Sequence, residues 1–137
     1  MEKIKKYLYQ RNEVIFAYLY GSYAKGNENK LSDIDIAIYI DKSKKPESGT
    51  FGYRSELITE LQSFVDKDID LIILNEVTNI LAYNVLKDGK LLFTKSYEKR
   101  INFHEKVMKT YLDFLPTRNI QDQYLKESIK NGKYGRG

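Results

Sequence analysis

Two aspartates stand two positions apart in the segment Ser32–Ile40, which reads SDIDIAIYI. Side chains alternate between the two faces of a strand, so Asp33 and Asp35 would share one face and the isoleucines the other. When two carboxylates lie so close together, the pKa of one of them is raised unless a cation lies between them. Mg²⁺ accepts such oxygen ligands together with substrate phosphates. The pair therefore indicates a metal site. The same alternation also fits an edge strand whose aspartates simply face solvent.

A glycine and a serine favour the first interpretation. Gly21 and Ser22 directly follow Val14–Tyr20, a predicted buried strand (VIFAYLY), and ten residues separate Ser22 from Asp33. Glycine allows a sharp turn, and exposed backbone N–H groups with a serine hydroxyl can hold a triphosphate. This spacing would place phosphates after one strand and metal ions on the next.

A third carboxylate is expected on a neighbouring strand. The segment Lys67–Leu74 (KDIDLIIL) predicts this strand, with Asp68 and Asp70 on one of its faces. Either aspartate could complete a set of ligands for two metal ions about 4 Å apart.

The remaining pattern predicts a small α/β (α+β) domain with a mixed, mainly antiparallel sheet flanked by helices. We expect a catalytic domain over residues 1–97 and a helical extension over residues 98–137 with a frayed end. The other expected elements are the helices Met1–Asn12, Tyr53–Val65 and Ile80–Leu86, the strand Leu91–Thr94, and a helix from about Glu98 to Leu112 that breaks near Pro116 and resumes over Ile120–Lys130.

The composition excludes several kinds of chemistry. The 137 residues contain no cysteine and one histidine, which removes thiolate zinc sites, cysteine nucleophiles and histidine-rich metal sites. The longest apolar run is far shorter than the about 20 residues that span a bilayer, so no membrane association is expected. The net charge of +4 lies in the last forty residues, which hold nine Lys or Arg and five Asp or Glu. We interpret it as an ordinary solvated surface and expect no nucleic-acid partner.

The stretch GSYAKGNENKLSDID resembles the signature of the nucleotidyltransferase superfamily related to DNA polymerase β. It is similar to the minimal nucleotidyltransferase (MNT) branch, which also has a glycine at the position of Gly26 and a serine at that of Ser32. Residues 69–74 and 85–93 are similar to two further motifs of that branch, and the length and helical tail resemble MntA-type antitoxins.

The resemblance implies a polymerase β-like fold that binds ATP and two Mg²⁺ ions. It assigns the metal ions to Asp33, Asp35 and Asp70, of which Asp70 would also help to deprotonate the acceptor hydroxyl. The nucleotide is assigned to Gly21, Ser22, Lys25 and Ser32. Lys25 stands where many members have arginine, which keeps the charge but loses the planar fork.

The resemblance also implies a partner. MntA-type proteins are cytoplasmic antitoxins that form hetero-oligomers with a HEPN-domain toxin, HepT, and transfer AMP from ATP to a tyrosine of that toxin. Two alternatives stay open: a nucleotidyltransferase that modifies a small molecule such as an aminoglycoside, and an antitoxin that acts by binding alone.

Overall fold

The computed structural model describes residues 1–21, 33–47 and 52–130, and for residues 115–130 it describes the backbone alone. The chain forms two units, Met1–His104 and Glu105–Gly137, each considered by itself. The elements are α1 (Glu2–Gln10), β1 (Val14–Tyr20), β2 (Ile34–Ile40), the 3₁₀ turn η1 (Lys42–Lys44), α2 (Tyr53–Gln62), β3 (Ile69–Ile73), α3 (Asn79–Asp88), β4 (Lys90–Thr94) and α4 (Tyr97–Lys130).

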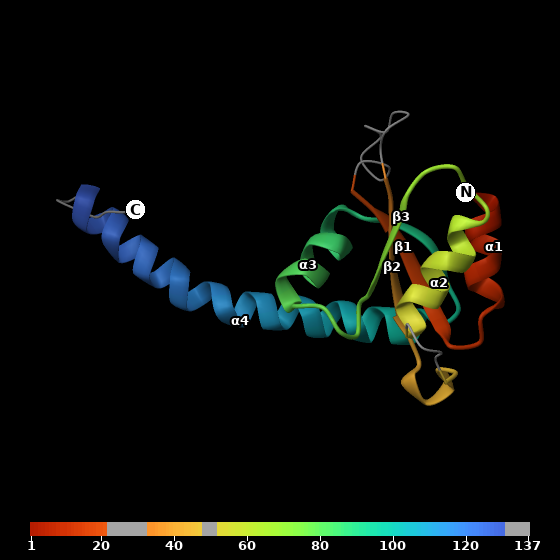
Figure 1. Cartoon of the computed structure of the whole chain (residues 1–137). Coiled ribbons are helices and arrows are strands. Elements are labelled where there is room, and N and C mark those ends of the chain that lie inside the picture. The colour runs from red at the N-terminus through yellow and green to blue at the C-terminus, as the bar shows by residue number, and fades with distance from the viewer. Residues whose placement is uncertain (22–32, 48–51, 131–137) are drawn as a thin grey trace. The chain divides into compact units, whose positions relative to one another are not determined.

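The strands form one four-stranded sheet in the order β3-β2-β1-β4 (Figure 1). β1 pairs antiparallel with both β2 and β4, whereas β2 and β3 are parallel. The parallel pair is possible because the connection from β2 to β3 contains α2, which provides the crossover that parallel neighbours need. The predicted mixed and mainly antiparallel sheet is confirmed.

One face of the sheet packs against α1 and α2. Ile36, Ile38 and Ile40 of β2 are buried there together with Leu8 of α1 and Leu57 of α2. Full burial of each such side chain contributes about 1.5–3 kcal/mol. The predicted alternation along β2 is confirmed, and the buried isoleucines leave Asp35 on the opposite face.

The opposite face is covered by α3 and the first turns of α4. Phe16 of β1 stacks on Tyr39 of β2 with ring centroids 4.8 Å apart, and Phe103 of α4 lies 4.8 Å from Tyr39. Ala82 and Val85 of α3 are also buried. These side chains cover the middle of the face and leave the end near Asp35 to polar groups.

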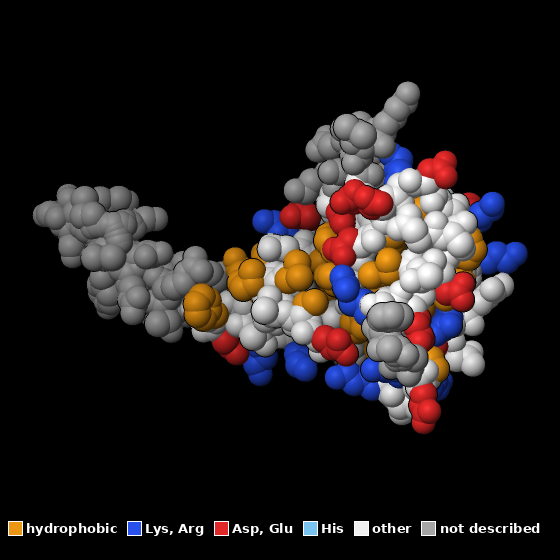
Figure 2. Space-filling view, in the orientation of Figure 1, with side chains coloured by type: hydrophobic (Ala, Val, Ile, Leu, Met, Phe, Trp, Pro, Cys, Tyr) orange, Lys and Arg blue, Asp and Glu red, His pale blue; other side chains and the backbone are white. Residues whose placement is uncertain are grey.

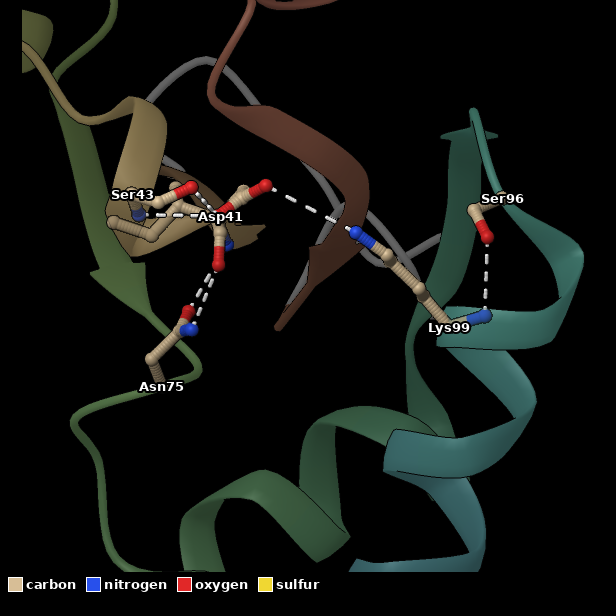
Figure 3. A network of polar contacts seen from close by, with 6 residues as sticks. Asp41, Ser43, Asn75, Ser96 and Lys99 are labelled. Carbon is tan, nitrogen blue, oxygen red and sulfur yellow. Dashed lines mark hydrogen bonds and ion pairs between the residues drawn. The ribbon is translucent and has the colours of Figure 1, made fainter.

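A polar network fixes the end of β2 that lies farthest from Asp35 (Figure 3). The Asn75 side chain accepts from the Ile40 N–H at 3.0 Å and donates to the Ile40 carbonyl at 2.9 Å. The Asp41 carboxylate accepts from the Ser43 N–H and hydroxyl and lies 3.9 Å from Lys99 Nζ. The network joins the segments after β2, after β3 and at the start of α4.

A buried carboxylate lies just before β1. Glu13 is 3% exposed, and it accepts hydrogen bonds from Tyr53 Oη at 2.6 Å and Arg11 Nε at 2.9 Å. Burial acts to raise its pKa, but the hydrogen bond from Tyr53 and the charge and hydrogen bond of Arg11 outweigh burial, so the pKa is lowered. Glu13 therefore ties α2 to the start of β1 in its ionised form.

We expect Tyr53→Phe to lower the free energy of unfolding at pH 7 by about 1–2 kcal/mol, since it removes one hydrogen bond to a buried carboxylate. A lowered pKa in the folded state gives stability above the pKa of the unfolded chain, and this stability is lost as the pH falls through the folded value. The difference between wild type and Tyr53→Phe should therefore shrink in acid. Urea unfolding at several pH values measures this difference, and Tyr97→Phe, which changes an exposed tyrosine, is the control. A difference that is independent of pH would contradict the prediction.

Two sequence expectations need correction. α4 runs without interruption from Tyr97 to Lys130, so the predicted break near Pro116 is wrong. Proline fixes φ at about −65°, which is a helical value, and a helix can pass through it at the cost of one hydrogen bond. Asp33 lies just before β2 rather than within it, because the strand begins at Ile34. No helix in the described ranges is long and apolar enough to cross a membrane.

Candidate active site

The strand pairing brings together the residues that carry the predicted chemistry. In the antiparallel pair Tyr20 lies opposite Asp35, and in the parallel pair Asp35 lies opposite Asp70. Neighbouring strands are about 4.8 Å apart, so the two carboxylates stand side by side on one face of the sheet. Gly21 follows directly at the end of β1. The sheet therefore gathers three of the predicted site residues at one end.

Gly21 leaves no room for a side chain. Its φ is +75°, in the left-handed region that favours glycine, and a Cβ built on it would lie 2.3 Å from Oδ2 of Asp35. The backbone thus approaches the Asp35 carboxylate closely at the point where the chain leaves β1. This close approach is the structural reason for a glycine at this position.

The carboxylates influence one another. The pKa of Asp35 is raised, first by partial burial and then by the negative charges of Asp70 and Asp33. Asp33 is exposed, next to the start of β2. Figure 2 shows several acidic side chains close together in the upper part of the visible face. Such a concentration of negative charge is relieved when a cation binds.

Asp70 interacts with Arg54 and with the Tyr20 hydroxyl. Arg54 NH2 lies 2.9 Å from its Oδ1, and the two side chains are each 49% exposed. The pKa of the Tyr20 hydroxyl is raised by burial, by the charges of Asp70 and Asp35, and by a hydrogen bond with Asp70. Asp68, the other candidate for the third carboxylate, is exposed and precedes β3. The position opposite Asp35 belongs to Asp70.

The oxygen donors suit a hard cation such as Mg²⁺. Asp35 and Asp70 are neighbours in register, and the raised pKa of Asp35 reflects negative charge that a divalent ion would balance. In the described part of the chain, no three His, Cys, Asp or Glu side chains are arranged as a ready set of metal ligands. Asp70 is paired with Arg54 instead. Asp35 and Asp70 therefore provide suitable oxygen atoms close to one another. Their side chains would have to adjust to form a full set of ligands for the ion.

Three predicted nucleotide-binding residues, Ser22, Lys25 and Ser32, lie outside the described residues. The sequence favours a surface role for Arg54, a cation at the start of a helix that could reach phosphate, and it does not predict the contact of Arg54 with Asp70. Its contact with Asp70 depends on α2 packing beside β3, which no local pattern reveals. The one local signal was the position of Arg54 in the first helical turn that follows the loop after β2.

Comparison with known proteins identifies curated relatives of this chain. A protein adenylyltransferase, MntA, from Shewanella oneidensis is 36% identical over 76 residues, which are 56% of this chain and 51% of MntA. The matched part thus spans about half the length of that curated relative.

Solved structures extend the likeness over most of the chain. A crystal structure of a toxin–antitoxin with AMP-PNP is 28% identical with a TM-score of 0.70, and it covers 87% of this chain and 93% of the other. A mutant of a toxin–antitoxin complex that contains MntA is 29% identical with a TM-score of 0.68, covering 87% and 91%. The model of the family described as "Polymerase beta, Nucleotidyltransferase" matches residues 2–98. The chain therefore belongs to the polymerase β nucleotidyltransferase family.

Proposed function

We propose that this protein is an antitoxin that acts as a Mg²⁺-dependent protein adenylyltransferase, transferring AMP from ATP to a tyrosine of a HEPN-domain toxin. The observation that carries the proposal is the convergence of Gly21, Asp35 and Asp70 at one end of the sheet. A glycine backbone that closely approaches neighbouring carboxylates suits a metal-bound triphosphate. A relative named as a protein adenylyltransferase and a toxin–antitoxin structure with an ATP analogue support it.

In the proposed reaction the acceptor oxygen attacks the α-phosphorus, the bond from that phosphorus to the bridging oxygen breaks, and pyrophosphate leaves. Asp70 takes the proton of the acceptor hydroxyl. Asp33 and Asp35 would hold the two Mg²⁺ ions with Asp70, and these ions would neutralise charge on the phosphates. Gly21 and Ser22 would hold the β- and γ-phosphates, with Lys25 and Ser32 beside them. Most of the rate enhancement would come from positioning and charge compensation.

We assign docking of the toxin to residues 98–137, in a hetero-oligomer, and place the reaction in the cytoplasm, where ATP is available. Leu112 and Phe114 are exposed apolar side chains of α4 within this segment and would provide contact area. Removal of residues 98–137 should then weaken toxin binding.

Intact-mass spectrometry of a co-expressed HEPN toxin tests the function. We expect a mass increase in units of AMP with the wild-type protein and none with Asp33→Asn, while Lys87→Gln, which changes an exposed lysine, serves as the control. Transfer to a small molecule without the toxin would instead support the small-molecule alternative. Equal neutralisation of the toxin by wild type and Asp33→Asn, with no mass change, would support action by binding alone.

A further inference from the structure

Arg54 is attached to the free edge of the sheet. β3 is the last strand in the sheet order, so among the described residues one side of its backbone has no neighbouring strand. Arg54 Nε donates to the carbonyl of Leu71 in β3 at 2.5 Å. This hydrogen bond satisfies a backbone acceptor at the edge of the sheet and fixes the guanidinium against the strand.

The same guanidinium extends to the neighbouring residue. NH2 of Arg54 donates to Oδ1 of Asp70 at 2.9 Å. One planar group therefore bonds the backbone of Leu71 and the side chain of Asp70 at once, which an ammonium group without a planar fork reproduces poorly. The contact holds the carboxylate relative to its own strand.

A second donor approaches Asp70 from β1. The Tyr20 hydroxyl interacts with Asp70, and the positive charge of Arg54 acts on this hydroxyl as well. Asp70 thus lies between a cation at the edge and a hydroxyl from the centre of the sheet. A carboxylate has about four lone-pair positions, so both contacts leave acceptor capacity for another ligand.

We propose that Arg54 is a positioning residue for AMP transfer. It ties Asp70 to the edge of β3 and supplies a fixed counter-charge to Asp70, which neighbours Asp35. The inference rests on the proposed function, in which Asp70 accepts the proton of the acceptor. Without Arg54 the carboxylate would gain rotational freedom and would be repelled by Asp35. A misplaced base lowers the rate even when the nucleotide still binds.

The kinetic test is a double-mutant cycle of Arg54→Gln and Asp70→Asn. We expect Arg54→Gln to lower kcat for AMP transfer by about tenfold or more with little change in the KM for ATP, because the residue acts through Asp70. Arg54→Gln should cost nothing further in the Asp70→Asn background. Arg54→Lys should be intermediate. Full additivity of the two losses, or an unchanged kcat, would overturn the inference.

A binding measurement tests the counter-charge without relying on activity. Mn²⁺ binding to the nucleotide-free protein, followed by electron paramagnetic resonance, should tighten by about fivefold in Arg54→Gln, which removes a cation about 3 Å from a metal ligand in a solvent-exposed site. Arg54→Lys keeps the charge and should bind Mn²⁺ like wild type, as should the control Lys87→Gln. Unchanged or weaker binding in Arg54→Gln would contradict the counter-charge.

The two proposals fail in different ways. If the wild type transfers no AMP, the proposed function fails, and Mn²⁺ binding still decides whether Arg54 is a counter-charge at Asp70. If the wild type transfers AMP and Arg54→Gln matches it in both measurements, only the inference about Arg54 fails. Thermal unfolding of each variant shows whether a loss comes from the site or from the fold.

Discussion

Asp35→Asn is expected to abolish AMP transfer, with a loss of about a thousandfold or more. Asp35 lies between Gly21 on one side and Asp70 on the other, so it is the carboxylate at the centre of the candidate site. Asparagine keeps the size of the side chain but removes the negative charge that would attract the metal ions. Transfer to the toxin, measured with labelled ATP, checks this expectation.

The same variant should not lose stability. The pKa of Asp35 is raised in the folded protein by burial and by Asp70 and Asp33, so its ionised form costs folding free energy. A carboxylate with a raised folded pKa loses stability as the pH rises through that value. Asp35→Asn should therefore be at least as stable as wild type at pH 7, and the difference should vanish in acid.

Asp68→Asn is the matched control, because this exposed aspartate precedes the same strand as Asp70 and lies outside the register of Asp35. It should transfer AMP at nearly the wild-type rate. Substantial activity in Asp35→Asn, or an equal loss in Asp68→Asn, would contradict the assigned site.

Gly21→Ala is expected to reduce transfer by about a hundredfold, because an added Cβ would lie 2.3 Å from Oδ2 of Asp35 and displace the carboxylate. The backbone adds to the cost, since φ of +75° disfavours alanine by about 1–2 kcal/mol. Steady-state transfer and urea unfolding measure the two effects separately.

Gly52→Ala separates strain from steric contact. Gly52 also has a positive φ, +91°, but a Cβ there would meet no atom of the described residues within 4 Å. Its ψ of 164° puts it in a region that only glycine adopts readily, so Gly52→Ala should lose at least as much stability as Gly21→Ala while retaining far more activity. Similar activity losses in the two variants would show that strain, and not displacement of Asp35, accounts for the effect.

The sequence predicted those parts of the site that depend on local pattern. The period of two in β2 placed Asp35 opposite the isoleucines, and a glycine after an apolar strand indicated the close approach at Gly21. The strand pattern left Asp68 and Asp70 open and the resemblance favoured Asp70, but the position of Asp70 opposite Asp35 depends on the register of β3 against β2, which no single segment encodes.

Contacts between distant segments were not predictable. Arg54 pairs with Asp70 and Tyr53 pairs with Glu13 only because α2 crosses from β2 to β3, and neither pair has a sequence signature. The break expected near Pro116 followed from proline's usual effect, but the helix continues through that residue.

The two ends of the strands carry different constraints. Glu13 and Asn75 bind the structure together at one end of β1 and β2, while Gly21 and Asp35 lie at the other end. Changes in affinity or acceptor choice can then accumulate at one end without removing the hydrogen bonds that preserve the fold at the other. Substitutions near the candidate site would then change recognition of the acceptor more than they change folding, which would let the protein adapt when its partner changes.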